Sequence, residues 1–280
     1  MSTEWKNLTL EDFDTLAATR LEFHQGIQNV AAVGRKFLPP NKNDEHATLL
    51  WYADLQRLAG HWIEGNTRFR SSIDFNTFSV HLVDSTFNSI AQIELHGKYH
   101  GQILVWLEEQ IAKLGLDTTQ LTLNLPYELP KELAKIGKPF DLPDPIYATE
   151  LGRYFHNGDL IAREVQAAFK SAEVRCWPHH FDISTKIIVN NTGNPDTSSY
   201  VTVGLSPGDD EINEPYFFAS PWPYPPLDEL PELTFGHWVD EHWVGAVLTA
   251  SEILQQPNQY KSVRKFISDC FSALRKLMTY

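Results

Sequence analysis

The sequence predicts an α+β protein in which short strands follow one another between helices. Apolar residues recur at a near-helical spacing in residues 16–37, 99–114, 147–171 and 258–278. Between these segments lie short runs rich in β-branched and aromatic residues, separated by polar breaks. Because strands then succeed strands without an intervening helix, we expect largely antiparallel sheets with helices on one face.

The first half of the chain shows a helix, about four strands and a second helix. Thr9 precedes an acidic turn and is the expected N-cap of the first helix, which Pro39-Pro40 ends. The strand-like runs lie between residues 47 and 95, and residues 121–125 are a further strand candidate. The second helix covers roughly 99–114, with Gly115 as its C-terminal stop.

The second half repeats this order after a proline-rich stretch. Five prolines fall between residues 126 and 145, which predicts a linker at 126–146. The linker divides the chain into an α+β half at 1–125 and a second α+β half at 147–280. The second half contains a helix at 147–171, a closing helix at 258–278 and, between them, strand-like runs at 174–189, 200–205, 215–219 and 243–250.

A short motif recurs in the first helix of each half. Phe23-His24-Gln25-Gly26 is matched 132 residues later by Phe155-His156-Asn157-Gly158, and each motif is followed by a second phenylalanine, Phe37 or Phe169. Self-similarity at a fixed offset indicates an internal duplication, with the two halves packed around a pseudo-twofold axis; a chance match is the alternative.

Composition excludes several classes of protein. The 280 residues include 23 Lys and Arg against 36 Asp and Glu, and the net charge of −13 would repel a nucleic-acid backbone. Two cysteines cannot make a disulfide framework, which suits a reducing compartment. No apolar run approaches the ~20 residues of a membrane span, and no signal-peptide pattern is evident. We expect a cytoplasmic protein with no nucleic-acid or membrane partner; a homo-oligomer stays open.

Several segments of the sequence are similar to those of a known family: residues 27–40, 46–52, 73–83, 114–116, 146–169 and 177–185. With them the chain resembles a family of bacterial proteins known only as a domain of unknown function. The likeness covers residues 15–190. It implies an α+β fold and no particular activity, because the family has none established. The chain departs from the family after Phe181-Asp182, where TKIIVNNTG (185–193) replaces a basic run.

Histidines and carboxylates concentrate in two segments of the second half, residues 176–182 and 236–243. In a strand, His180 and Asp182 would share one face, and His237 or His242 would join them from another strand. These four residues are the candidate metal ligands, with a divalent metal as the cofactor they suggest, and His180 and Asp182 are the candidate catalytic pair. The alternative is a surface hydrogen-bond pair beside core aromatic residues.

Residues 214–226 alternate aromatic residues with prolines 221, 223, 225 and 226, which disfavour a central strand. Rigid aromatic segments of this kind line ligand clefts or bind partner proteins, and the alternative is a long loop held over the core by its own aromatic side chains. The expected ligand-binding residues are Trp177, Tyr216, Phe218, Trp222, Tyr224 and Trp238.

Two classes of function follow from these patterns. In the first, the protein is a small-molecule enzyme or binding protein whose His and Asp groups lie beside an aromatic–proline cleft wall. In the second, it is an interaction protein that uses residues 214–226 to bind a partner or a second copy of itself. The sequence favours the first, and it does not specify a ligand, a reaction or whether any turnover occurs.

Overall fold

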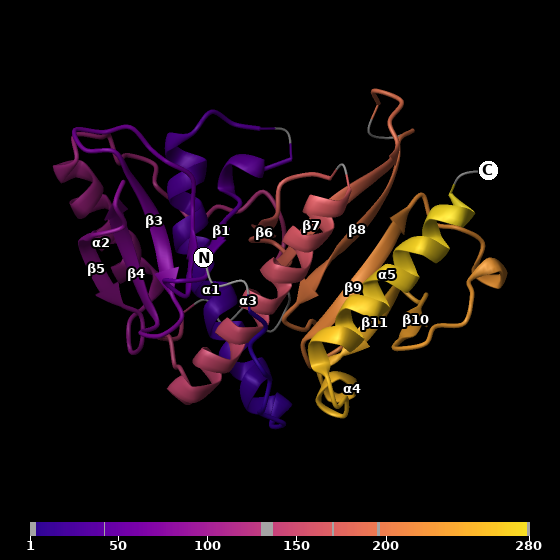
Figure 1. The fold of residues 1–280 in the computed structure, drawn as a ribbon. Coiled ribbons are helices and arrows are strands. Elements are labelled where there is room, and N and C mark those ends of the chain that lie inside the picture. Colours follow the sequence, from indigo (N-terminus) through magenta and orange to yellow (C-terminus); the bar gives the residue numbers. More distant parts are fainter. Residues whose placement is uncertain (1–3, 42, 130–136, 170, 195–196, 279–280) are drawn as a thin grey trace. The chain divides into compact units, whose positions relative to one another are not determined.

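The computed structural model describes residues 4–41, 43–129, 137–169, 171–194 and 197–278. The chain forms two compact units (Figure 1). The first unit contains Asp12–Gly152 together with Cys176–Phe181. The second unit contains the N-terminal segment that ends at Glu11, then Arg153–Arg175 and Asp182–Tyr280. No helix among the described residues is both long and apolar enough to cross a membrane.

The first unit is built on a five-stranded antiparallel sheet in the order β1-β2-β3-β4-β5, so neighbours in the chain are neighbours in the sheet. Two helices flank the strands in the chain. The elements are α1 (Phe13–Phe37), the 3-10 turn η1 (Glu45–Ala47), β1 (Leu50–Tyr52), β2 (Arg57–Ala59), β3 (Phe69–Asp74), β4 (Ser79–Asp84), β5 (Ser89–Glu94) and α2 (His100–Lys113).

Helix α1 begins later than the sequence suggests. The N-cap is Asp12, whose carboxylate accepts a hydrogen bond from the Thr15 backbone at 3.1 Å, so the prediction that Thr9 caps this helix is wrong. Thr9 belongs instead to the N-terminal segment of the second unit. From Leu16 to Gly34 nearly every side chain of α1 is buried, which makes α1 the central helix of the first unit.

The first sheet presents two chemically different faces. On β3, Ser71 donates a hydrogen bond to the Val30 carbonyl of α1, and Ile73 packs against Gly26 of the same helix. Since side chains alternate along a strand, Arg70 and Ser72 lie on the opposite face. The face toward α1 is apolar, and the face away from it carries buried polar groups.

The second sheet has six strands in the order β10-β11-β9-β8-β7-β6; strands β7 to β11 belong to the second unit, whereas β6 passes into the first unit at Cys176. The ladders that join β7 to β8, β8 to β9, β9 to β11 and β11 to β10 are antiparallel. The elements are α3 (Pro145–Ala168, which enters the second unit at Arg153), β6 (Arg175–Trp177), β7 (Asp182–Asn190), β8 (Ser199–Ser206), β9 (Tyr216–Trp222), the 3-10 turn η3 (Leu227–Glu229), β10 (His237–Val239), β11 (Gly245–Thr249), α4 (Ala250–Leu254) and α5 (Gln259–Leu277).

Helices α3 and α5 lie on the same apolar face of the second sheet (Figure 1). Gly158 of α3 packs directly on β7 and β8: a Cβ at this position would lie 2.7 Å from the Ile183 side chain and 2.8 Å from Leu205 Cβ. A glycine is therefore needed for the helix to approach the strands this closely.

The N-terminal segment packs into the second unit through Trp5 and Lys6. The Trp5 ring stacks on Phe217 at 6.0 Å, and the Asn157 amide forms hydrogen bonds with both the backbone N–H and the carbonyl of Lys6, at 2.8 and 2.7 Å. The His156 Nε2 lies 2.8 Å from the Glu4 carbonyl oxygen. The motif of α3 therefore holds a segment about 150 residues earlier in the chain.

The observed strands differ in detail from those predicted. The sheets have five and six strands where about four were expected in each half, because the sequence does not indicate the three-residue strands β2 and β10 and because the run 174–189 forms two strands, β6 and β7. Residues 121–125 form no strand. Of the proline-rich stretch, Phe140 is buried and exchanges backbone hydrogen bonds with Gly97 and Lys98 in the first unit, and residues 130–136 lie outside the described residues.

Pro221 lies inside a strand that has neighbours on both sides, although the prolines were expected to exclude residues 214–226 from such a position. Strand β9 lies between β8 and β11. Its ladder with β11 covers only Tyr216–Ala219, whereas its ladder with β8 continues to Trp222. At Pro221 the strand has a neighbour on one side alone, which is the edge-like position that proline tolerates.

Candidate functional site

The predicted strand through His180 and Asp182 is interrupted by a turn. Strand β6 ends at Trp177 and β7 begins at Asp182. Between them the Phe181 N–H donates a hydrogen bond to the Trp177 carbonyl, and Phe181 has a φ of 60°, in the left-handed region. Strand alternation does not apply across such a turn, so the expectation that His180 and Asp182 share one strand face is wrong.

His180 and Asp182 have different surroundings. His180 is exposed and belongs to the first unit, where its ring lies 4.1 Å from that of His179. Burial and the neighbouring His180 lower the pKa of His179 to about 4. Asp182 is buried in the second unit, where it contributes to the raised pKa of the Tyr216 hydroxyl behind the larger effects of burial and Asp209.

The two remaining candidate metal ligands each face a carboxylate of their own. His237 Nδ1 lies 3.8 Å from Glu252, and His242 Nε2 lies 3.6 Å from Glu211. Both imidazoles are exposed. Among the residues that the structure describes, no group of three or more His, Cys, Asp or Glu side chains could hold a metal ion. We therefore propose no metal site for these histidines.

Tyr216 and Phe218, expected to line a cleft, lie in a small apolar cluster of the second unit. They pack with Val247, and the Trp243 ring covers both at 6.5 and 6.2 Å. The Tyr216 hydroxyl donates to Asp209, and burial raises its pKa. These two residues are part of the packing of the second sheet, as in the alternative of aromatic side chains that hold their own segment in place.

Trp222 and Tyr224 are exposed, by 40% and 46%, and their rings meet edge-on at 5.8 Å. Across the sheet, Trp222 pairs with Tyr200 and Tyr200 pairs with Ile188, so these side chains form a row over β9, β8 and β7. We call Trp222, Tyr224, Tyr200 and Ile188 the aromatic row. It is an apolar surface on the face of the sheet opposite α3 and α5.

The other two expected ligand-binding residues have local partners. The Trp238 indole donates to the Pro231 carbonyl at 2.7 Å. The Trp177 ring meets His179 edge-on at 5.8 Å. Trp177 belongs to the first unit and Trp238 to the second, so the structure does not define one aromatic wall from the six predicted residues.

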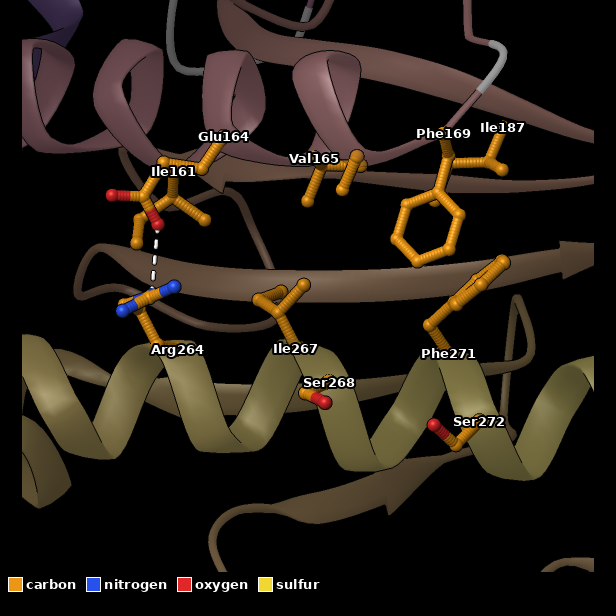
Figure 2. A pocket seen from close by; sticks show the side chains of 11 residues that line it. Ile161, Glu164, Val165, Phe169, Ile187, Arg264, Ile267, Ser268, Phe271 and Ser272 are labelled. Carbon is orange, nitrogen blue, oxygen red and sulfur yellow. Dashed lines mark ion pairs between the residues drawn. The ribbon is translucent and has the colours of Figure 1, made fainter.

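A ligand-sized groove lies between α3 and α5 in the second unit (Figure 2). It has a volume of about 250 Å³ and opens to solvent. We call it the α3–α5 groove. Its apolar lining is Ile161, Val165, Ala168, Phe169, Ile187, Ile267 and Phe271. Its polar lining is Glu164, Arg264, Ser268 and Ser272.

One end of the α3–α5 groove is charged. Arg264 Nε lies 2.9 Å from Glu164 Oε2, and the Tyr260 hydroxyl donates to the other oxygen of the same carboxylate. The hydrogen bond to Glu164 is the main cause of a raised pKa of Tyr260. Glu164 thus has both oxygens occupied, while the Arg264 side chain is 58% exposed.

The other end of the groove is aromatic. The Phe169 and Phe271 rings pack at 4.5 Å, and Figure 2 shows them facing each other from the two helices. Phe169 stays partly exposed, and Ile187 of β7 is a buried part of the lining. Helical spacing explains the lining: residues 161 and 165 follow one side of α3, Phe169 comes directly after the end of that helix, and residues 264, 267 and 271 follow one side of α5.

The sequence indicates some of the lining residues of this groove but not the groove itself. The apolar face of residues 147–171 contains Ile161, Val165 and Phe169, but Arg264 reads as part of a solvated face of the last helix. The groove exists because α3 pairs with α5, about 100 residues later, and no local pattern specifies that pairing.

Comparison of the chain with protein-family models, with curated proteins and with solved structures finds no match. The resemblance to a bacterial family of unknown function stays a prediction.

Proposed function

We propose that this protein binds a small molecule that has an apolar body and an acidic end group, in the α3–α5 groove. The observation that carries the proposal is an open groove of about 250 Å³ whose apolar lining ends at an exposed arginine. For comparison, an engineered apolar cavity of about 150 Å³ is enough to bind benzene. Small-molecule binding is the class of function that the sequence favours, but the proposed site differs from the His, Asp and aromatic residues that the sequence suggests.

The lining supports this chemistry in two ways. Isoleucine, valine and phenylalanine side chains gain from contact with an apolar body, at roughly 25 cal/mol per Å² of apolar surface buried. Arg264 forms an ion pair with Glu164 through Nε, and its other N–H groups can bind a carboxylate at the groove mouth. Glu164 and Tyr260 hold the guanidinium near the groove.

Phenylpropionate and phenylpropanol are suitable probes, because they share an apolar body and differ in the end group. We expect phenylpropionate to bind more tightly in calorimetric titrations, and Arg264→Gln to remove the difference between the two. Ser268→Phe places a ring in the groove from an exposed position of α5 and should abolish binding without loss of stability.

Lys276→Phe, which adds a ring to an exposed position of α5 outside the groove, is the matched control and should bind normally. Unchanged binding in Ser268→Phe would place the ligand elsewhere on the protein. Failure of both probes to bind, with no shift of the Ile161, Val165 or Ile267 methyl resonances, would overturn the proposal.

The aromatic row supports a second candidate function, the association of this chain with a second copy or a partner protein. Exposed apolar surface of this kind, with Lys186 lying 4.0 Å from the Tyr200 ring centre at its edge, is typical of interaction surfaces. Light scattering after size exclusion tests self-association. We expect a dimer that Trp222→Ser together with Tyr224→Ser dissociates; a wild-type monomer at all concentrations would exclude self-association.

We also propose that the two halves arose by an internal duplication. Gly26 and Gly158, the equivalent glycines of the two motifs, both lie where a helix packs closest on its sheet. A Cβ would lie 2.8 Å from Ile73 at the first and 2.7 Å from Ile183 at the second. These matching roles support a common origin of the two halves, and their pseudo-twofold packing stays a prediction.

The cellular setting is proposed from composition alone. The net charge of −13 supports a protein without nucleic-acid partners. Two free and buried cysteines suit the reducing conditions of the cytoplasm.

A further inference from the structure

Arg70 is a buried cation on the polar face of the first sheet. Its side chain is only 4% exposed. The guanidinium carbon lies 3.4 Å from the ring centre of Trp62 and 5.0 Å from those of Tyr52 and Phe87. Three aromatic rings therefore surround the positive charge and keep water from it. Burial is the main cause of a lowered pKa of this arginine.

No carboxylate in the described part of the chain neutralises Arg70. Among the residues that the structure describes, none of the Asp or Glu side chains lies within ion-pair distance of this guanidinium, and its hydrogen bond is donated to the Tyr52 hydroxyl. Arg57 on the neighbouring strand differs: its Nε donates to Asp74 at 2.8 Å. A fully buried arginine is almost always paired, so the unpaired Arg70 calls for an explanation.

Two hydrogen-bond donors on this face have no partner. The Nε of Arg70 and the Oγ of Ser72 are both buried and form no hydrogen bond. The two residues are two positions apart on β3 and therefore point to the same face. A buried donor without a partner costs about 1–3 kcal/mol, and more when the group is charged.

The neighbouring polar groups do not supply the missing acceptor. His81 pairs with Ser72 across the β3–β4 ladder, but its two ring nitrogens are hydrogen-bonded to Ser79, at 2.7 Å, and Ser89, at 3.1 Å. Burial lowers the pKa of His81 to about 4, so the ring is neutral at pH 7. The carboxylate of Asp74 is occupied by Arg57 and by the backbone N–H groups of Asn76 and Thr77.

We propose that the first unit binds a small oxyanion, inorganic phosphate or the carboxylate of a small acid, which accepts hydrogen bonds from Arg70 Nε and Ser72 Oγ. The anion supplies the charge that Arg70 lacks and satisfies both orphan donors at once. Charge-assisted hydrogen bonds of this kind are about twice as strong as neutral ones. This site is independent of the α3–α5 groove, since all its residues belong to the first unit.

The experiment follows the Nε–H resonance of Arg70 by ¹H–¹⁵N correlation NMR, because a buried guanidinium N–H exchanges slowly with water. The protein is titrated with inorganic phosphate, acetate and, as a salt control, sodium chloride. We expect one arginine Nε–H resonance to shift saturably with phosphate or acetate; which of the two binds more tightly distinguishes a free inorganic ion from a carboxylate ligand.

Three variants connect the signal to the site. Arg70→Lys keeps the charge but removes Nε and its resonance, which assigns the shifting signal to Arg70. Ser72→Ala keeps the size and should weaken binding about tenfold, the equivalent of one hydrogen bond to a charged group. Arg68→Gln changes an exposed arginine whose guanidinium also lies over Trp62, at 5.2 Å, and should bind as the wild type does.

Two results would overturn the proposal. In the first, the Arg70 Nε–H resonance does not respond to phosphate or acetate at concentrations of about 100 mM, which would leave a water molecule and the aromatic rings as the only partners of the cation. In the second, Ser72→Ala binds as tightly as the wild type, which would place the anion elsewhere. Ser72→Ala leaves Arg70 and its Nε–H resonance in place, so this variant stays informative if Arg70→Lys does not fold.

Discussion

The imidazole Nε2 of His24 lies 2.9 Å from the carbonyl oxygen of Pro178, a residue 154 positions later in the chain. Gln28 donates to the same carbonyl at 2.8 Å. These hydrogen bonds hold the segment 176–181 in the first unit. His24 is buried, and burial lowers its pKa to about 3 even though the hydrogen bond to Pro178 favours the protonated ring.

Acidification should therefore destabilise the first unit. In the unfolded chain His24 takes up a proton near its ordinary pKa of 6.5, whereas in the folded chain it stays neutral down to about pH 3. The stabilisation is complete above pH 6.5 and is lost progressively as the pH falls toward 3. Between pH 6.5 and about pH 5 the loss is about 2 kcal/mol for this histidine.

Urea unfolding at several pH values measures the effect. His24→Gln keeps a donor for the Pro178 carbonyl but has no ring to protonate, so its stability should fall less steeply below about pH 6.5. His242→Gln changes an exposed histidine and should follow the wild-type curve. Equal slopes in His24→Gln and the wild type would contradict the buried neutral state of His24.

Three glycine-to-alanine substitutions should rank in a definite order. Gly158→Ala is expected to destabilise by about 2–3 kcal/mol, since its Cβ would meet Leu205 Cβ at 2.8 Å and the branched Ile183 at 2.7 Å. Gly26→Ala meets the ends of the Ile73 and Leu95 side chains, which can rotate, so about 1 kcal/mol is expected. Gly101→Ala meets nothing within 4 Å and should stabilise α2 by up to about 1 kcal/mol.

Differential scanning calorimetry of the three variants measures the ranking. A Gly158→Ala variant as stable as Gly101→Ala would show that α3 does not need a glycine to approach β7 and β8. That result would also remove the main support for an equivalent role of the two repeated motifs.

The sequence predicted the long elements well because their signals are local. The expected helices at 99–114 and 258–278 match α2 and α5 within one residue at each end. Strands β2 and β10 are three residues long and too short for any alternation to be visible. Helix α1 begins at Phe13, after the N-cap Asp12, because the N-terminal segment packs in the second unit, which is a tertiary effect.

The candidate sites were less predictable for physical reasons. His180 and Asp182 read as one strand face because nothing in the sequence indicates the left-handed Phe181 between them. The α3–α5 groove requires the pairing of two distant helices. Arg70 did carry a usable signal, since Arg70, Ser72 and Asp74 follow one another at every second position and therefore place three polar groups on one face of β3.

Asn157→Ala should release the N-terminal segment from the second unit. The variant leaves the backbone N–H and carbonyl of Lys6 without partners, and we expect a loss of about 2–3 kcal/mol. Limited proteolysis should cut residues 4–11 faster in Asn157→Ala than in the wild type. Asn7→Ala, at an exposed position, is the control and should be cut at the wild-type rate.

Both cysteines should be unreactive in the native protein. Cys176 and Cys270 are free and fully buried, and burial raises the pKa of Cys270 to about 12, so almost no thiolate forms at neutral pH. Ellman's reagent should label neither thiol until urea unfolds the chain, and both afterwards. Rapid labelling of native Cys270→Ser would show that Cys176 is more accessible than the structure indicates.

The assignment of the segment up to Glu11 to the second unit sets an order for synthesis on the ribosome. This segment is translated more than 140 residues before Asn157, Phe217 and Gln259, its partners. The first unit is likewise incomplete until residues 176–181 have been translated. During translation the apolar side chain of Trp5 therefore stays exposed until its partners have been made. In this period a chaperone could bind the exposed segment.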